Sequence, residues 1–230
     1  MTKVYLDPGH GGSDPGAVGN GLKEKDITLA ITKKVETLLK ENFENVEIKM
    51  SRSSDTYPSL IARTNEANAW GADVFLSIHI NANTSNLARG FSTYVYPNAG
   101  AATLAMQNVV HQEIFNAVKH LKVSDLGKMQ ANFHVLRESN MNAILTENFF
   151  ISNATDAAYL KDDQFLDLLA HGHVIGLEKF LGLKLKPFTP PPSSTKYRVI
   201  TGSFSSRENA EAHMADLKEN GYDSFIEVKE

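Results

Sequence analysis

The chain has 230 residues, of which 42% are hydrophobic and 22% are charged, a composition typical of a folded globular protein rather than a disordered one. Its 23 lysine and arginine residues against 27 aspartate and glutamate residues give a formal charge of −4, so there is no general basic surface for nucleic acid. Cysteine is absent, which excludes a disulfide scaffold, a thiolate nucleophile and a zinc–thiolate site.

Strands and helices are expected to alternate along the first 183 residues. Short apolar runs rich in β-formers predict strands at residues 4–6, 46–50, 74–79, 91–96 and 143–146. Apolar residues at helical spacing predict helices at residues 27–42, 59–70, 101–121 and 164–181. This alternation predicts an α/β domain with helices on both faces of a sheet, and an active site at the carboxyl ends of the strands.

A proline- and serine-rich stretch separates this domain from a short tail. Residues 184–196 include three consecutive prolines, which favour an extended spacer and end the preceding helix. We therefore expect a catalytic domain at 1–183, a linker at 184–196 and a C-terminal segment at 197–230. That segment is expected to form a single βαβ unit, with strands at 197–204 and 221–226 around a helix at 205–220. One such unit can hardly bury both of its faces, so we expect half of a module.

The loop after the first strand carries the first candidate residue. Residues 7–17 are rich in glycine and proline, so they favour neither a helix nor a strand. The small residues beside His10 would let a bulky substrate approach its imidazole. A phosphate-binding loop is the competing interpretation, but the glycine spacing matches neither of the two common phosphate-binding motifs.

Two further residues could join His10. His79 closes a predicted strand, and two parallel strands would direct both imidazoles into one crevice. Glu24 lies just before the first predicted helix, where an acidic residue is also favoured by the helix dipole alone. Together the three side chains form a set that could hold zinc and leave a position open for water. Structural histidines are the alternative.

Glu147 ends the last predicted strand of the domain and is a candidate general base. Partial burial there would raise its pKa toward neutrality. The alternative is an ion pair with Arg63 or Arg137. Among the other histidines, His134 is a candidate for the substrate cleft or a structural residue.

The remaining histidines are not expected to form a metal site. His171 and His173 stand two apart on a predicted helix and should face different directions. His111, His120 and His213 are expected on helix surfaces.

Several separated motifs resemble one enzyme family. In chain order they are Asp7-Pro8-Gly9-His10-Gly11-Gly12, Glu24-Lys25-Asp26, Ser51-Arg52, Arg63-Thr64-Asn65, Ser77-Ile78-His79-Ile80-Asn81 and Thr146-Glu147-Asn148. Over residues 1–183 the chain resembles the zinc-dependent N-acetylmuramoyl-L-alanine amidases (the Amidase_3 type) of cell-wall turnover, sporulation and phage lysis. It resembles most closely the sporulation and mother-cell-lysis enzymes of bacilli, and phage endolysins share the catalytic domain. The tail resembles part of a SPOR peptidoglycan-binding domain.

The resemblance implies a fold, a site and a reaction. The fold would have three layers (αβα) around a mixed, mostly parallel sheet. By the resemblance His10, Glu24 and His79 are ligands of a Zn²⁺ cofactor and Glu147 is the catalytic residue. The partner is peptidoglycan, and the reaction is hydrolysis of the amide between the muramic acid lactyl group and L-alanine. Asp7, Asp14 and Asn81 are candidates for orienting the imidazoles, and Asn81 and His134 for binding substrate.

Two other functions stay open at this point: a catalytically inactive wall-binding protein, and a zinc peptidase that cuts within the stem peptide. We expect a monomer, unless the half SPOR-like unit pairs between chains. No run of about 18 apolar residues could span a bilayer, and the first residues lack the pattern of a secretory signal. We therefore expect synthesis in a bacterial or host cytoplasm, no membrane partner, and action at the cell wall after lysis or holin-type release.

Overall fold

The computed structural model describes residues 1–187 and 206–219, and the chain divides into two compact units, residues 1–186 and 187–230. In the second unit the structure describes one helix, α7 (Arg207–Glu219), which agrees with the helix predicted at 205–220. The two strands predicted in the tail lie outside the described residues. None of the helices in the described part of the chain combines the length and the apolar character needed to cross a membrane.

The first unit is built on a six-stranded sheet with the order β4-β1-β5-β8-β6-β7. Four of the five neighbouring pairs are parallel, and only β6 and β8 run antiparallel. The sheet is therefore mixed and mostly parallel, as expected from the resemblance. The strands are β1 (Thr2–Pro8), β4 (Val46–Met50), β5 (Val74–Asn81), β6 (Phe91–Val95), β7 (Asp125–Gln130) and β8 (Asn142–Phe150).

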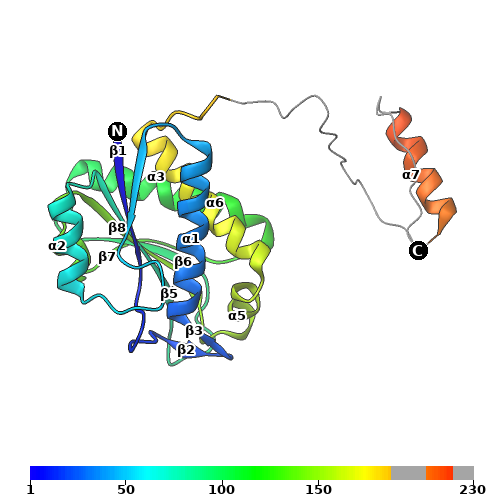
Figure 1. The fold of residues 1–230 in the computed structure, drawn as a ribbon. Coiled ribbons are helices and arrows are strands. Elements are labelled where there is room, and N and C mark those ends of the chain that lie inside the picture. The colour runs from blue at the N-terminus through cyan, green and yellow to red at the C-terminus, as the bar shows by residue number, and fades with distance from the viewer. Residues whose placement is uncertain (188–205, 220–230) are drawn as a thin grey trace. The chain divides into compact units, whose positions relative to one another are not determined.

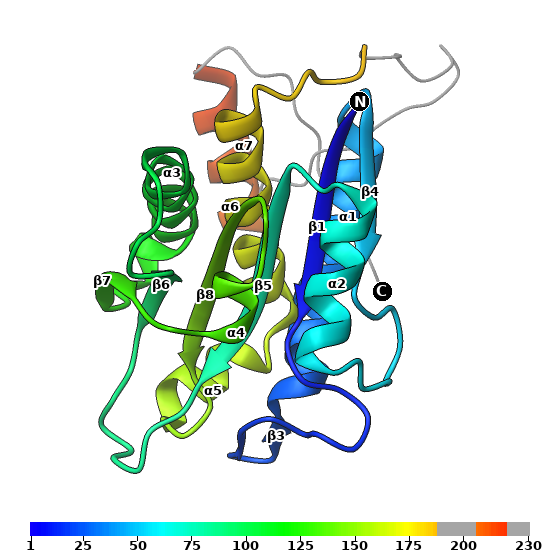
Figure 2. The ribbon, with the colours of Figure 1, turned by 90° about the vertical axis from the view of Figure 1, so that its left-hand side faces the viewer.

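Helices cover both faces of this sheet, which gives three layers (Figures 1 and 2). One face carries α1 (Glu24–Asn42), α3 (Ala101–Val118) and α6 (Asp163–Leu181), and α6 packs against both of the others. The other face carries α2 (Leu60–Trp70) and the short α4 (His134–Arg137). The smaller elements are the hairpin of β2 (Val18–Gly19) and β3 (Leu22–Lys23), the 3-10 helix Lys119–Leu121 and α5 (Ala154–Leu160).

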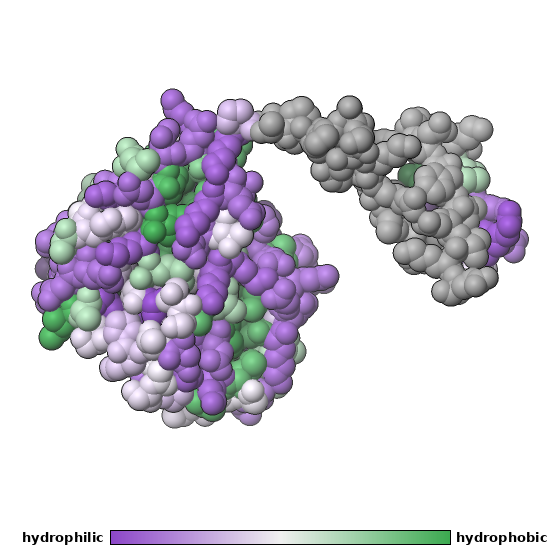
Figure 3. Space-filling view, viewed as in Figure 1, coloured by the Kyte–Doolittle hydropathy of each residue, from purple (hydrophilic) through white to green (hydrophobic). Residues whose placement is uncertain are grey.

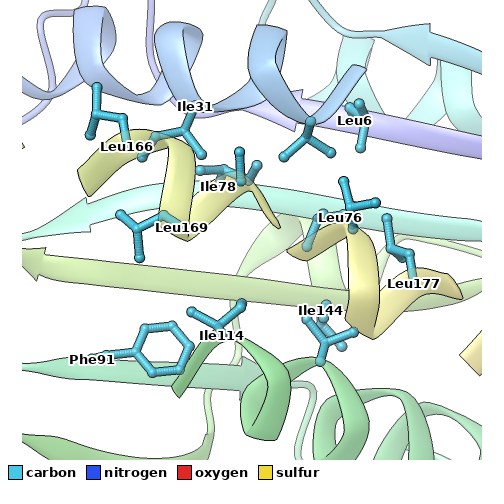
Figure 4. Close-up of a cluster of buried hydrophobic side chains, with 14 of the residues drawn as sticks. Leu6, Ile31, Leu76, Ile78, Phe91, Ile114, Ile144, Leu166, Leu169 and Leu177 are labelled. Atoms are coloured by element: carbon cyan, nitrogen blue, oxygen red, sulfur yellow. The ribbon is translucent and has the colours of Figure 1, made fainter. Parts of the chain in front are cut away.

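Alternation along the strands separates two apolar cores. Leu6, Ile78 and Ile144 face α1, α3 and α6, and Figure 4 shows Ile78 beside Leu166 and Leu169. Their neighbours on the strands point to the other face and pack under α2 and α4. Successive side chains of a strand point to opposite faces, so each strand serves both cores. Polar side chains dominate the outer side of α1 (Figure 3), which agrees with the solvent-facing side of an amphipathic helix.

Some boundaries differ from the sequence prediction. α1 begins at Glu24 rather than at residue 27, so Glu24 occupies its first turn. β8 runs four residues beyond the predicted end. β7 was not predicted because its sequence, DLGKMQ, is largely exposed and has no run of buried apolar residues to mark a strand.

Candidate active site

The loop after β1 needs glycine because two side chains pass close to its backbone. A Cβ added at Gly9 would lie 2.4 Å from the His79 ring, and one added at Gly16 would lie 2.6 Å from Glu24 Oε2. His10 itself has a φ of 60°, a conformation that non-glycine residues seldom adopt. The loop therefore holds a strained histidine in tight contact with the other candidate ligands.

Two buried arginines hold this loop by its carbonyl oxygens. Arg63 donates from Nη1 to the Pro8 carbonyl at 2.8 Å and from Nη2 to the His10 carbonyl at 2.7 Å. Arg52 donates from Nη2 to the Gly9 carbonyl at 2.8 Å. Three successive carbonyl groups are thus satisfied by guanidinium donors, and this fixes the path of the chain through His10.

Asp7 lies behind the loop and keeps Arg63 in place. Its Oδ1 is 2.6 Å from Arg63 Nη1 and 2.6 Å from Ser51 Oγ, and its Oδ2 is 2.8 Å from Ser77 Oγ. Burial alone would raise the pKa of Asp7, but the Arg63 charge and these hydrogen bonds outweigh burial and hold the pKa below its usual range. Asp7 therefore stays charged as the partner of Arg63 and does not contact either imidazole.

His10, Glu24 and His79 converge at the carboxyl ends of β1 and β5. One ligand atom from each lies within 4.8 Å of the others. Glu24 Oε1 is 3.1 Å from His10 Nε2 and 3.0 Å from His79 Nδ1. The two rings are edge to face, with their centroids 4.9 Å apart. The strand ends and the start of α1 thus place three potential metal ligands around one point.

Further contacts fix the orientation of these groups. Asp14 Oδ2 is 2.8 Å from His10 Nδ1, which leaves Nε2 directed at Glu24. The Ala17 amide donates to Glu24 Oε2 at 2.8 Å, and the Ile80 amide donates to Oε1 at 3.0 Å. An imidazole whose other ring N–H donates to a carboxylate is typical of metal-binding histidines.

The electrostatics of the cluster favour a cation. Burial opposes the charge of Glu24, but hydrogen bonds from His10 and His79 hold its pKa below the usual range. Burial would lower the pKa of His10, but the carboxylates of Glu24 and Asp14 raise it to about 9. The cluster thus favours positive charge, and two imidazoles with one carboxylate match the ligand set of a zinc ion that keeps a further position open.

Glu147 lies beside the cluster on the neighbouring strand. It is the register partner of His79 in the parallel β5–β8 pair, so both side chains point to the same face of the sheet. Its Oε2 is buried and has no hydrogen-bond partner among residues 1–187 and 206–219. Burial raises the pKa of Glu147 to about 7.

The alternative expected for Glu147, an ion pair with Arg63 or Arg137, does not occur. Arg63 pairs with Asp7, and Arg137 pairs with Glu138 at 2.7 Å. Glu147 is therefore a carboxyl group that can hold or release a proton near neutral pH and has an oxygen free for a ligand.

The other candidate residues lie at the edge of the site or outside it. Asn81 ends β5, and its side chain accepts a hydrogen bond from the Ala82 amide at 2.8 Å rather than contacting an imidazole. His134 begins α4, half-buried, with Nε2 3.5 Å from Thr64 Oγ1. Of the three residues considered for orienting the imidazoles, only Asp14 contacts one of them.

One expectation about the other histidines was wrong. His111 was expected on a helix surface, but it is buried, because its ring bridges Thr93 and Asp125 across the β6–β7 edge of the sheet. His173 is also fully buried and contacts Thr146. Helical spacing alone did not identify these side chains, because their polar partners lie on strands distant in sequence.

A sequence profile of the N-acetylmuramoyl-L-alanine amidases matches residues 4–179. The chain belongs to this family. The resemblance expected from the motifs is thereby confirmed, and the family makes the chain an amidase acting on peptidoglycan. A profile of the SPOR domain matches residues 179–227 of the same chain.

Relatives and solved structures agree with this assignment. A sporulation-specific N-acetylmuramoyl-L-alanine amidase of Bacillus subtilis (strain 168) is 47% identical over 230 residues, covering 100% of this chain and 86% of the relative. An endolysin of Bacillus phage SPP1 is 46% identical over 189 residues, covering 81% of this chain and 69% of the relative.

The solved catalytic domain of CwlV, an amidase from Bacillus (Paenibacillus) polymyxa var. colistinus, matches with a TM-score of 0.75 and 38% identity, covering 80% of this chain and 100% of that one. The three-layer fold of the amidase is thus shared with an enzyme of the same class.

Proposed function

We propose that the chain is a zinc-dependent amidase that hydrolyses the bond between the lactyl group of muramic acid and L-alanine in peptidoglycan. The observation that carries the proposal is the convergence of His10, Glu24 and His79 beside Glu147, a carboxyl group without a partner in the described part of the chain. Family membership supplies the substrate class, and the side chains supply the chemistry.

His10, Glu24 and His79 would hold the zinc ion. A zinc ion in such a site acidifies water and polarises a carbonyl group. Asp14 keeps His10 in the tautomer that presents Nε2, and the Ala17 and Ile80 amides keep the Glu24 carboxylate in place. These contacts fix the ligands in advance, so little rearrangement is needed at the moment of reaction.

Glu147 carries the proton. Its carboxylate accepts a proton from the attacking water and returns it to the departing amine of L-alanine. A pKa of about 7 suits both steps, since the group can lose and regain a proton at neutral pH. No covalent acyl-enzyme is required.

Digestion of purified peptidoglycan tests this proposal. We expect soluble peptides with new alanine amino groups and no new reducing sugar ends, and we expect chelation of the metal to stop their release. Reducing ends would indicate a glycosidase. Products that keep the lactyl–alanine bond would indicate a peptidase, and pelleting with walls without products would indicate a binding protein.

The second unit would bring the enzyme to its substrate. The SPOR match over residues 179–227 favours binding of peptidoglycan by this part of the chain. Co-sedimentation with purified walls checks this, comparing the full chain with a chain ending at residue 186, the boundary of the first compact unit. Equal binding by both, with the shortened chain folded by circular dichroism, would contradict a role in wall binding.

A further inference from the structure

Strand β8 is irregular directly after Glu147. Its pairing with β5 shifts register between His79 and Asn81, so two residues of β8, Asn148 and Phe149, lie opposite one residue of β5. Phe149 is fully buried and has a φ of 71°, a conformation that a bulky residue adopts only when its surroundings impose it. Bulges of this kind are common beside active sites, where they redirect side chains.

Asn148, inside the bulge, holds the His79–Ile80 peptide group, which contacts the proposed metal ligand Glu24. It is fully buried, and its Nδ2 donates to the His79 carbonyl oxygen at 3.0 Å and to Thr146 Oγ1 at 2.9 Å. The same peptide group, between His79 and Ile80, donates its N–H to Glu24 Oε1 at 3.0 Å. One peptide plane is thus held on its oxygen side by Asn148, and on its nitrogen side it holds the central ligand of the cluster.

His173 determines which way this chain of hydrogen bonds runs. Its Nδ1 is 2.7 Å from the Leu169 carbonyl oxygen, which can only accept, so Nδ1 carries the hydrogen. Nε2 then accepts from the Thr146 hydroxyl at 3.0 Å, and the hydroxyl oxygen is left to accept from Asn148. His173 stays neutral because complete burial lowers its pKa to about 4.

We infer that Asn148 is a positioning residue of the amidase: through the His79–Ile80 peptide it sets the carboxylate of Glu24, and Thr146 and His173 hold its carboxamide in the required orientation. This inference rests on the proposed zinc site. Asn148 Oδ1 has no hydrogen-bond partner within the described residues, so the contacts of Nδ2 are what orient the group. The bulge thus places Asn148 within hydrogen-bond distance of the His79 carbonyl, while Glu147 faces the same side of the sheet as His79.

A neighbouring pair of residues offers a matched control. Thr93 is the register partner of Thr146 on β6, and its Oγ1 is 3.0 Å from Nδ1 of the buried His111. This is the same threonine–histidine contact between a strand and a helix, beneath the same layer of helices. The other ring nitrogen of His111, Nε2, is 3.0 Å from Asp125 Oδ1, so this pair is connected to Asp125 and not to the proposed zinc ligands.

The experiment measures zinc affinity in the full chain by competition with a chromophoric chelator, with circular dichroism and thermal unfolding as measures of folding. We expect Asn148→Ala to weaken zinc binding by about 10-fold or more, the range found for partners of metal ligands. Thr146→Val should weaken it less, and Thr146→Ser, which keeps the hydroxyl, should retain it. Thr93→Val should lower the unfolding temperature as Thr146→Val does, but leave zinc affinity unchanged.

Two results would overturn the inference: folded Asn148→Ala with the zinc affinity of the original chain, or equal losses of affinity in Thr93→Val and Thr146→Val. If Asn148→Ala does not fold, the threonine series decides alone. Failure of the original chain to bind zinc would instead overturn the proposed function, so the two failures are distinguishable.

Discussion

The cluster of His10, Glu24 and His79 lies beside Glu147 at one end of the sheet, yet the hydrogen bonding of the two is opposite. Around the cluster His10, Glu24 and their neighbours satisfy one another, with Asp14 on one imidazole and backbone amides on both carboxylate oxygens. Glu147 is left with a buried oxygen that has no partner in the part of the chain that the structure describes. In the proposed mechanism, the groups that would hold the metal are fixed before anything binds, whereas the group that would exchange a proton is kept free of competing partners.

The largest effect is expected from removing a ligand. His79→Ala should abolish stoichiometric zinc binding and reduce the release of peptides from peptidoglycan to background, since two remaining ligands hold zinc poorly. Metal analysis after dialysis and product mass spectrometry measure both. His171→Ala, on the exposed side of α6, is the control. Full zinc content in His79→Ala would show that His79 is not a zinc ligand.

Glu147→Gln separates the two regions. It should lower the rate of hydrolysis by about 10²- to 10⁴-fold, the usual contribution of a general base, because the amide cannot take a proton. Zinc content should stay that of the original chain, since Glu147 is not one of the three converging ligands. Glu138→Gln, which changes an exposed carboxylate, is the control, and loss of zinc together with activity would make Glu147 a ligand instead.

Breaking the buried ion pair between Arg63 and Asp7 should lower the free energy of unfolding. Arg63→Met leaves Asp7 buried without its partner, which is expected to cost about 3–5 kcal/mol in the free energy of unfolding. Arg137→Met removes an exposed pair with Glu138 and should change this free energy by less than about 1 kcal/mol. Urea unfolding of both variants measures the difference. Similar values for the two would show that the buried pair does not hold the loop.

The buried His173, which contacts Thr146, should make the free energy of unfolding fall as the pH is lowered. Burial lowers the pKa of His173 from 6.5 to about 4, so the unfolded chain binds a proton there more readily than the folded one. The stabilisation from the neutral His173 is complete above about pH 6.5 and is lost as the pH falls toward 4. At pH 5 the loss in unfolding free energy is about 2 kcal/mol. His173→Gln should therefore show a smaller loss of unfolding free energy between pH 7 and 5. An unchanged slope would contradict a neutral buried His173.

The smallest effect is expected from the carboxylate that orients His10. Asp14→Asn weakens the contact with His10 Nδ1 and should reduce zinc affinity by about 10-fold, the lower end of the range for such partners. Asp55→Asn is a matched control. Asp14 and Asp55 each accept a hydrogen bond from a backbone amide of this loop, but Asp55 touches neither imidazole. Chelator competition on both variants should show a loss only for Asp14→Asn.

How far the sequence anticipates the site depends on the residue. His10 follows an apolar strand, and His79 and Glu147 stand at the predicted ends of two others. Parallel strands end at one edge of a sheet, so their proximity could be predicted from the pattern. Arg63 and Asn148 stood in the quoted motifs, but nothing in their surroundings showed what they would contact. Both donate to backbone carbonyl oxygens as well as to side chains, and the availability of a carbonyl oxygen depends on the fold rather than on residue type.

By itself the sequence determined the layered α/β domain, the end of the sheet that carries the chemistry and the family. These follow from local information: alternation of apolar residues, glycine in a crowded loop and motifs at fixed places. The tertiary structure alone decided that Arg63 and Arg137 pair with other carboxylates and not with Glu147, that His111 and His173 are buried, and that β8 bulges after Glu147. Each depends on which residues from distant segments meet in a closely packed interior, and a linear pattern does not contain that information.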